Sequence, residues 1–288
     1  MHSGYGFFEF DPGEPVALDL IERTVREARR KLGHVHAVVL PEDALAADEL
    51  VPVEQTVAEL GVDCLLTGVR AGPDGPRMGT QLVHFGARTG DGWVHYQQAK
   101  HHRWCLDEAQ VRQYHLCGAL DPAKLWWESI DLPVRTAQVV DVGGGATIAP
   151  LICEDLARLD EVADVLRRVG PSLVIALLLD GPQLPQRWPA RYATVLADEP
   201  GSAVLTLTAF GMVARSRPPG RRRSRAVALW SAPGTGLHQL DLAAGAKGIA
   251  ITLSLGSDTV WTADGRCHRD STPVLALRGV EQLYGRAG

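Results

Sequence analysis

The stretch Ala146–Asp155 reads ATIAPLICED: an apolar run ends at a cysteine, and two acidic residues follow at once. The run predicts a buried strand, and the segment after it predicts a helix. A thiol at such a turn is held at the rim of a sheet, beside a helix N-terminus whose dipole favours the thiolate. Cys153 is therefore a candidate nucleophile, although a lone cysteine in this position is more often a buried structural thiol.

Two charged residues upstream occupy the same kind of position. Glu42 follows the strand expected over residues 35–40 and a proline that fixes the turn. Burial there would raise the carboxyl pKa and allow it to act as a base near neutral pH. Lys100 ends a strand-like run over residues 94–98, where its ammonium could stabilise an oxyanion. Each also has an ordinary interpretation: an acid at a helix N-terminus and a solvated lysine at a hairpin end.

The rest of the chain alternates helical and strand-like patterns. Helices are expected over residues 15–32, 52–60, 155–169 and 189–199. Strands are expected over residues 5–10, 35–40, 64–69, 81–87, 93–98, 134–142, 146–153, 172–179, 203–208, 226–230 and 248–253. Residues 101–133 show no clean periodicity. Hairpins interleaved with helices predict an α/β protein with mixed sheets in two or more layers, and the absence of a linker or repeat predicts a single domain over residues 1–288.

Composition excludes several classes of protein. The chain has 288 residues, 45% of them hydrophobic and 22% charged, with a net charge of -5, so a large core is expected and bulk nucleic-acid binding is not. Its five cysteines include no CxxC pair, which argues against a disulfide framework or a zinc ribbon and favours the cytoplasm. The N-terminal segment lacks the features of a signal peptide, and the longest apolar run, residues 173–179, is too short to cross a membrane.

The order and context of the three candidate residues resemble the carbon–nitrogen hydrolase, or nitrilase, superfamily. The family's strand–Pro–Glu segment is matched by Val38–Glu42 (VVLPE), its lysine segment by Tyr96–Lys100 (YQQAK) and its cysteine segment by Leu151–Asp155 (LICED). The Cys-Glu-Asp form is most similar to the glutaminase domains of glutamine-dependent NAD synthetases. The resemblance covers residues 35–255. The first strand lacks the glutamine usual in the family, and residues 156–160 replace its usual Arg-Phe-Pro-Glu-like segment.

Further segments extend the resemblance and add site residues. Lys100–Glu108 (KHHRWCLDE) resembles the corresponding stretch of aliphatic amidases, where a second structural glutamate stands at the offset of Glu108. Glu108 is therefore expected as the fourth member of the site, with Glu128 as the weaker candidate. Trp188 and Phe210 match the segments after the nucleophile that face the substrate.

The resemblance implies a four-layer αββα sandwich, a homodimer or larger homo-oligomer, and hydrolysis of a small amide through a thioester on Cys153. In that scheme Glu42 is the base, Lys100 and the backbone N–H of Glu154 stabilise the oxyanion, and Glu108 positions Lys100. No metal or cofactor is required. Two alternatives remain open: a catalytically inactive nitrilase-like sensor or scaffold, and an acyltransferase of the same superfamily.

Three other features have simpler explanations. Gly143–Gly145 lies between two expected strands, which predicts a hairpin turn and not a phosphate-binding loop. His101 and His102 with Cys105 do not make a metal site, because adjacent histidines rarely point the same way and a fourth ligand is missing. Arg215–Arg225 contains six arginines. It is expected to be a solvated mobile loop, with an anion-binding flap as the sharper alternative.

Overall fold

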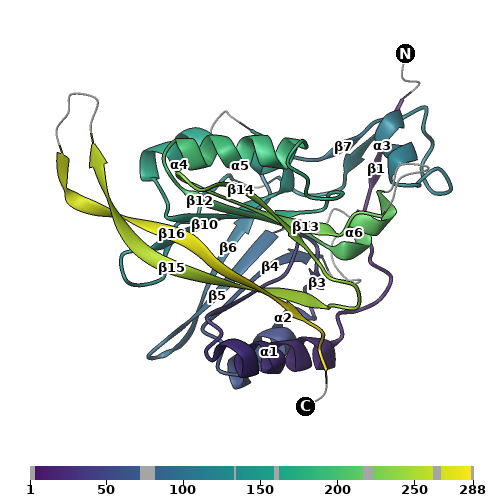
Figure 1. Cartoon of the computed structure of the whole chain (residues 1–288). Helices are drawn as coiled ribbons and strands as arrows, with labels where there is room; N and C mark the ends of the chain where they lie inside the picture. Colours follow the sequence, from purple (N-terminus) through teal and green to yellow (C-terminus); the bar gives the residue numbers. More distant parts are fainter. Residues whose placement is uncertain are drawn as a thin grey trace.

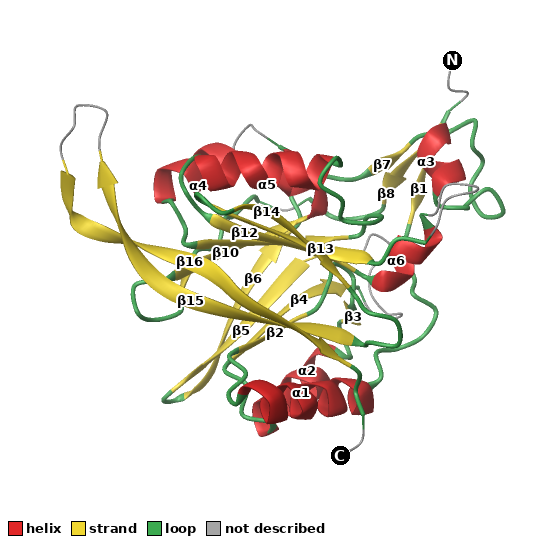
Figure 2. Ribbon diagram, viewed as in Figure 1, coloured by secondary structure: helices red, strands yellow, loops and turns green. Residues whose placement is uncertain are grey.

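The computed structural model describes residues 4–71, 82–132, 134–158, 162–216, 223–261 and 267–286. Two sheets pack face to face between two layers of helices (Figures 1 and 2). This is the expected αββα sandwich, with parallel and antiparallel pairs in each main sheet. Residues 217–222 of the arginine-rich segment lie outside the described residues.

The first sheet carries the cysteine. Its strands run in the order β14-β13-β12-β11-β10-β9. Their bounds are β9 (Val140–Asp141), β10 (Thr147–Ile152), β11 (Leu173–Leu178), β12 (Ala203–Thr208), β13 (Ala226–Ala232) and β14 (Gly236–Asp241). The strands β10, β11 and β12 are parallel neighbours and buried along most of their length, which explains their continuous apolar runs. The helices α4 (Val162–Val169) and α5 (Trp188–Asp198) cover the outer face of this sheet (Figure 2).

The second sheet carries the glutamate and the lysine. Its strands are β2 (Ala37–Val39), β4 (Cys64–Arg70), β5 (Leu82–Thr89) and β6 (Gly92–Ala99), in that order, with β3 (Leu45–Ala46) also pairing with β4. Its outer face is covered by α1 (Leu18–Leu32) and α2 (Leu50–Glu59) (Figure 1). Val83 and Phe85 of β5 point to the inner face and join the core formed with β10 and β11. The alternate residues of β5 therefore face the helices.

The segment over residues 101–133 is more ordered than its pattern predicts. It contains β7 (Cys105–Leu106), α3 (Glu108–Gln113) and β8 (Leu125–Glu128). The strand β8 pairs in parallel with β1 (Tyr5–Phe8) and antiparallel with β7. Such short strands exist because a distant segment pairs with them, so local periodicity does not reveal them. They matter because the last residue of β8 reaches the candidate site.

Two long strands complete the fold. The strands β15 (Gly248–Trp261) and β16 (Cys267–Leu283) form a hairpin, of which the sequence predicted only the strand over residues 248–253. Apolar residues of this hairpin pack against the core between the sheets. The short helix α6 (Phe210–Arg215) follows β12. Gly143–Gly145 connects β9 to β10 as a hairpin turn, as expected, although β9 is only two residues long. Among the helices of the described ranges, none has both the length and the apolar composition needed to cross a membrane.

Candidate active site

The three candidate residues converge at one edge of the sandwich. Glu42 follows β2, Lys100 follows β6 and Cys153 follows β10, and all three are at least 97% buried. Gln98 of β6 donates a hydrogen bond to the carbonyl of Pro150 in β10 at 3.1 Å, which ties the strand of the lysine to the strand of the cysteine. Strands that are distant in the sequence therefore deliver three reactive side chains to a single buried cluster.

A glycine makes room for the turn that carries the glutamate. A Cβ built on Gly68 of β4 would lie 2.6 Å from the Cα of Glu42 and 2.6 Å from the backbone nitrogen of Asp43. The Gly68 N–H donates to the carbonyl of Pro41 at 3.2 Å, which closes the turn against β4. Only a residue without a side chain permits this backbone approach. The position of Glu42 thus depends on Gly68 as well as on Pro41.

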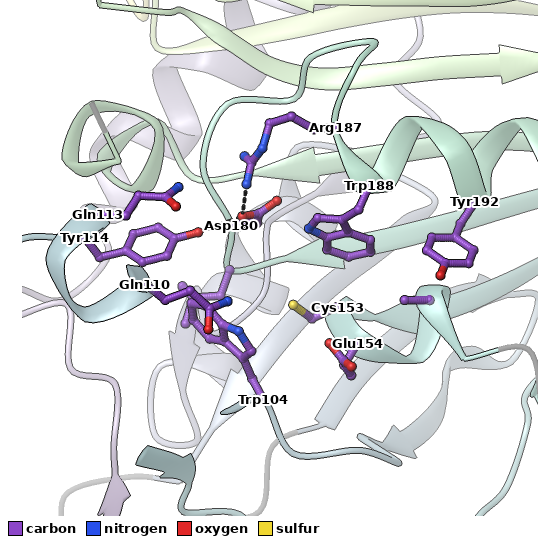
Figure 3. Close-up of a pocket in the computed structure, with 12 residues that line it drawn as sticks. Trp104, Gln110, Gln113, Tyr114, Cys153, Glu154, Asp180, Arg187, Trp188 and Tyr192 are labelled. Atoms are coloured by element: carbon purple, nitrogen blue, oxygen red, sulfur yellow. Dashed lines mark hydrogen bonds and ion pairs between the residues drawn. The ribbon is translucent and has the colours of Figure 1, made fainter. Parts of the chain in front are cut away.

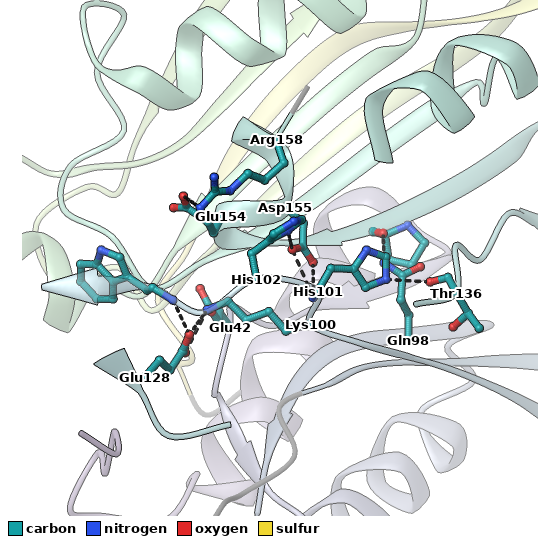
Figure 4. Close-up of polar contacts among 12 residues, drawn as sticks. Glu42, Gln98, Lys100, His101, His102, Glu128, Thr136, Glu154, Asp155 and Arg158 are labelled. Atoms are coloured by element: carbon teal, nitrogen blue, oxygen red, sulfur yellow. Dashed lines mark hydrogen bonds and ion pairs between the residues drawn. The ribbon is translucent and has the colours of Figure 1, made fainter. Parts of the chain in front are cut away.

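The ammonium of Lys100 lies between two carboxylates (Figure 4). Its Nζ donates to Oε1 of Glu42 at 2.8 Å, to Oε1 of Glu128 at 2.9 Å and to Oε2 of Glu128 at 2.7 Å. Trp104 also donates its backbone N–H to Oε2 of Glu128 at 3.0 Å. Burial of a charge is costly unless partners compensate it, and here the cation has two anionic partners.

Glu128, and not Glu108, holds the lysine. Glu108 begins α3, and its half-exposed carboxylate pairs with Arg112 one turn later at 2.9 Å. Glu128 ends β8, and its pairing with β1 and β7 points it to Lys100. The expectation for Glu108 was therefore wrong, because an offset in the sequence does not report the register of a three-stranded sheet. The weaker candidate, Glu128, occupies the position.

The cysteine occupies an unusual backbone conformation. Cys153 has a φ of 43°, in the left-handed region that non-glycine residues rarely adopt, and begins a 3₁₀ turn over Cys153–Ala157. This turn replaces the start of the helix expected over residues 155–169. Its thiol is hydrogen-bonded to the Glu42 side chain and receives a backbone hydrogen bond from Leu179. Strained backbone at a strand end is a feature of functional sites, where it fixes the direction of a side chain.

The pKa shifts assign the resting protonation of the site. Burial raises the pKa of Glu42 above its usual value, against the lowering effect of Lys100. Burial, together with the charge of Glu42, raises the pKa of the Cys153 thiol well above its usual value. Burial by itself lowers the pKa of Lys100, but Glu128 and Glu42 outweigh it, and the net pKa rises well above its usual value. The thiol is therefore neutral and the ammonium charged near neutral pH, with the Glu42 carboxyl next to both.

Asp155 ties the lysine segment to the cysteine turn. Its two carboxylate oxygens accept the backbone N–H of His101 at 3.2 and 3.1 Å, and Oδ1 accepts Nδ1–H of His102 at 2.9 Å (Figure 4). The Asp155 carboxylate is buried. His101 and His102 therefore stabilise the turn that carries Cys153 by donating hydrogen bonds to this carboxylate. The two residues that follow Lys100 are thereby fixed to the residue two positions after Cys153.

Cys153 also lines a cavity of about 270 Å³. Figure 3 shows its sulfur directed into the space between Trp104 and Trp188. The complete lining consists of Trp104, Gln110, Gln113, Tyr114, Cys153, Glu154, Ala157, Leu179, Asp180, Arg187, Trp188 and Tyr192. Trp188 and Glu154, two of the expected site residues, are part of this lining. Phe210 is not among these residues, and its ring packs against the guanidinium of Arg225 at 4.4 Å.

The cavity lining also contains polar residues that were not expected from the sequence. Oδ1 of Asp180 accepts hydrogen bonds from the Tyr114 hydroxyl at 2.7 Å, from Nη2 of Arg187 at 2.8 Å and from the Gly181 N–H at 2.7 Å. The sequence contained one indication that Asp180 belongs to the site, because this residue directly follows the strand expected over residues 172–179. That strand is β11, the parallel neighbour of the cysteine's strand, and the carboxyl ends of parallel neighbours meet at the same edge of a sheet.

Known proteins resemble this chain only in structure. No family model matches the sequence, and no curated protein matches it. A mutant of the Nesterenkonia AN1 amidase from the nitrilase superfamily matches with 16% identity and a TM-score of 0.50, covering 83% of this chain and 84% of that chain. Another mutant of the amidase from Nesterenkonia sp. AN1, which shows the result of Michael addition of acrylamide at the active site cysteine, matches with 15% identity and a TM-score of 0.51, covering 83% and 87%.

A yeast protein matches with similar scores. Saccharomyces cerevisiae Nit3, a member of branch 10 of the nitrilase superfamily, has 12% identity and a TM-score of 0.50 over 79% of this chain and 82% of that chain. Identities this low report the shared fold and leave the chemistry to be argued from the site. The chain has the nitrilase-superfamily fold.

Proposed function

We propose that this chain, which has the nitrilase-superfamily fold, is a divergent member of that superfamily and hydrolyses a carbon–nitrogen bond in a small amide through Cys153. One observation carries the proposal: Glu42, Lys100 and Cys153 share a single buried cluster whose sulfur opens into a cavity. A nucleophile next to a base, with a fixed cation beside it, is the arrangement that acyl transfer requires.

The first half of the reaction forms a thioester. Glu42 takes the thiol proton as the sulfur of Cys153 attacks the amide carbon, because a neutral thiol is a weak nucleophile. Negative charge then develops on the carbonyl oxygen, near the ammonium of Lys100 and the backbone N–H of Glu154. A fixed donor of this kind contributes roughly 3 kcal/mol. Glu42 returns its proton to the leaving nitrogen, the carbon–nitrogen bond breaks, and ammonia or an amine departs.

The second half restores the enzyme. Glu42 removes a proton from a water molecule, the water oxygen attacks the thioester carbon, and the carbon–sulfur bond breaks to release a carboxylic acid. The proton held by Glu42 returns to the sulfur. Glu128 keeps Lys100 charged and in place through both halves, since it contacts the ammonium at 2.7 and 2.9 Å. Every step uses side chains of this chain and water.

The cavity favours a small substrate with polar groups. Its volume of about 270 Å³ lies below the range of roughly 300–1,000 Å³ that is common for ligand pockets. Trp104 and Trp188 provide flat apolar walls, while Asp180 and Arg187 provide charged groups in the same lining. We therefore place short-chain amides with a polar terminal group first among the substrates to be screened.

The test is intact-mass spectrometry combined with an assay for released ammonia or amine on a panel of small amides. The wild-type protein is expected to release product and to form a transient acyl adduct on Cys153. The Cys153→Ala variant should lose at least about 10³-fold in kcat, as enzymes do when their nucleophile is removed. Cys117→Ala is the matched control, because that cysteine is exposed and outside the cavity lining, and it should leave turnover unchanged. Turnover by Cys153→Ala at the wild-type rate would overturn the proposal.

The proposal extends to the setting of the protein. We place it in the cytoplasm, because its five cysteines are odd in number and include no CxxC pair, a pattern that favours a reducing compartment. We also propose a homodimer, which the resemblance to the nitrilase superfamily implies. Sedimentation of the purified chain would separate a dimer from a monomer, and a monomer at micromolar concentration would contradict this part.

A further inference from the structure

A second polar cluster lies on the other face of the sheet that carries Lys100. It consists of Glu54 on α2, His84 on β5 and His95 on β6. The even-numbered residues of β5 face the helix layer, because Val83 and Phe85 enter the core between the sheets. Three separate elements therefore contribute one side chain each to the same spot between α2 and the hairpin of β5 and β6.

The carboxylate of Glu54 is held by both imidazoles. Its Oε2 lies 3.0 Å from Nε2 of His84, and its Oε1 lies 2.6 Å from Nε2 of His95. All three ligand atoms lie within 4.8 Å of one another. In a tetrahedral zinc site with bonds of about 2.0–2.1 Å, neighbouring ligand atoms are roughly 3.3 Å apart. Small rotations of the side chains would therefore be sufficient to admit an ion between them.

Burial distinguishes this cluster from an ordinary surface pair. The His84 side chain is 3% exposed and the Glu54 side chain 17% exposed. The His95 side chain is 47% exposed, which leaves one side of the cluster open to water. The Nδ1 atom of His84 is buried without a hydrogen-bond partner, so Nε2 provides the only polar contact of that ring in the described structure. Coordination of a cation by Nε2 would further compensate the burial of this imidazole.

A glycine makes room for the carboxylate. Gly86 lies opposite His95 in the register of β5 and β6. A Cβ on Gly86 would lie 2.9 Å from a ring carbon of Trp93 and 3.3 Å from Oε2 of Glu54. The missing side chain thus allows the indole and the carboxylate to lie close to the sheet, where both histidines can reach the carboxylate.

We propose that Glu54, His84 and His95 bind one divalent transition-metal ion, with Zn²⁺ as the preferred occupant. Two imidazoles and a carboxylate form a donor set that zinc favours, and the open side at His95 leaves the fourth position to water. The ion joins α2 to β5 and β6 and so stabilises the sheet whose last strand leads to Lys100. This role is structural and is independent of the amide hydrolysis proposed above.

The chain offers a control with the same ligand types. His34, His36 and Asp63 also lie within metal-binding distance of one another, but the side chains of His34 and Asp63 are 46% and 41% exposed. A flexible surface group loses more conformational freedom when it binds an ion than a cluster that packing has already ordered. Metal binding at Glu54 is therefore expected to be the tighter of the two.

The experiment is titration calorimetry of Zn²⁺ into the full chain after removal of metals with a chelator, together with the melting temperature at each zinc concentration. The wild-type protein is expected to bind one equivalent tightly and to melt at a higher temperature with zinc, because an ion that binds only the folded state stabilises it. In His95→Asn the affinity should fall at least about tenfold, since even losses outside the ligand shell cost that much. His34→Asn should bind zinc as the wild type does.

The variants distinguish loss of zinc binding from loss of folding. His95 is half-exposed, so its substitution leaves the core intact, and circular dichroism of His95→Asn will confirm this. The buried His84→Asn variant serves as the second test and should also lose the zinc-dependent rise in melting temperature. Structural zinc sites have dissociation constants of at most about 1 μM. The proposal is overturned if the wild type shows no zinc binding at a zinc concentration roughly 100-fold above that value. It is equally overturned if His95→Asn binds like the wild type, or if only His34→Asn loses binding.

Discussion

Two ionic clusters occupy one sheet of this protein, and they differ in how completely they are closed. At the edge of the sheet, Lys100 and Glu42 have fully buried side chains and Glu128 is 6% exposed. On the outer face, His95 leaves the second cluster half open. In a closed cluster each buried charge needs partners within the protein, and Lys100 has two carboxylate partners, whereas an open cluster can take up an ion from solution. The difference supports the proposed chemistry at the first cluster and the proposed metal binding at the second.

The largest effect after loss of the nucleophile is expected from Glu128→Gln. This change keeps the shape of the side chain but removes one of the two charges that compensate buried Lys100. Lys100 keeps Glu42 as an anionic partner, so the loss is that of hydrogen bonds to a charged group, about 1.5–3 kcal/mol, and both stability and turnover should fall. Urea unfolding and kcat/KM measure the two effects.

Glu108→Gln is the matched control for Glu128→Gln. Glu108 is exposed and pairs only with Arg112 along α3 in the described structure, so its substitution should leave turnover and stability almost unchanged. If Glu108→Gln lowered turnover as much as Glu128→Gln, the assignment of the fourth residue to Glu128 would be wrong.

The two glycines provide a second comparison. Gly68→Ala forces a methyl group against the backbone of Glu42 and Asp43 at 2.6 Å, and backbone cannot move aside easily. Overpacking of this kind costs about 1–3 kcal/mol, and a displacement of the base by about 1 Å lowers turnover by roughly 10²-fold. Gly86→Ala contacts side-chain atoms at 2.9 and 3.3 Å, which can yield.

Gly86→Ala is therefore expected to weaken zinc binding while turnover stays at the wild-type level. Steady-state kinetics and zinc calorimetry on both variants make the comparison. Loss of turnover in Gly86→Ala, or full turnover in Gly68→Ala, would show that the two clusters are not separable in the way that the geometry indicates.

The smallest perturbation is a change of pH, which alters no residue. Glu42 acts as a base only when it is ionised, and burial raises its pKa above the ordinary 4.5. The value of kcat/KM should therefore fall as the pH falls through this raised pKa, whereas Lys100, whose pKa is also raised, stays charged. A pH–rate profile with a substrate that does not titrate measures the acid limb. A rate that stays constant down to pH 4.5 would contradict the role of Glu42.

Much of the fold could be predicted from local pattern. The hairpin of β5 and β6, the parallel run of β10, β11 and β12, and helices α1, α2 and α5 all appear close to their expected ranges. These elements have a strong period or a clear turn, so the local sequence is sufficient. The strands β7 and β8 could not be predicted in the same way, because each is short and exists through its pairing with the other or with β1, which lies within the strand expected over residues 5–10.

The sequence by itself showed that Glu42, Lys100 and Cys153 each follow an expected strand, because strand patterns are local. Only the tertiary structure decided that Glu128 replaces Glu108, that Asp180 lines the same cavity as the sulfur, and that Glu54 meets two histidines. Lys100 and Glu128 are 28 positions apart in the sequence, and Glu54 is 30 and 41 positions from its two histidines. Strand register and the packing of α2 on the sheet set such distances, and neither is encoded in any short stretch of the chain.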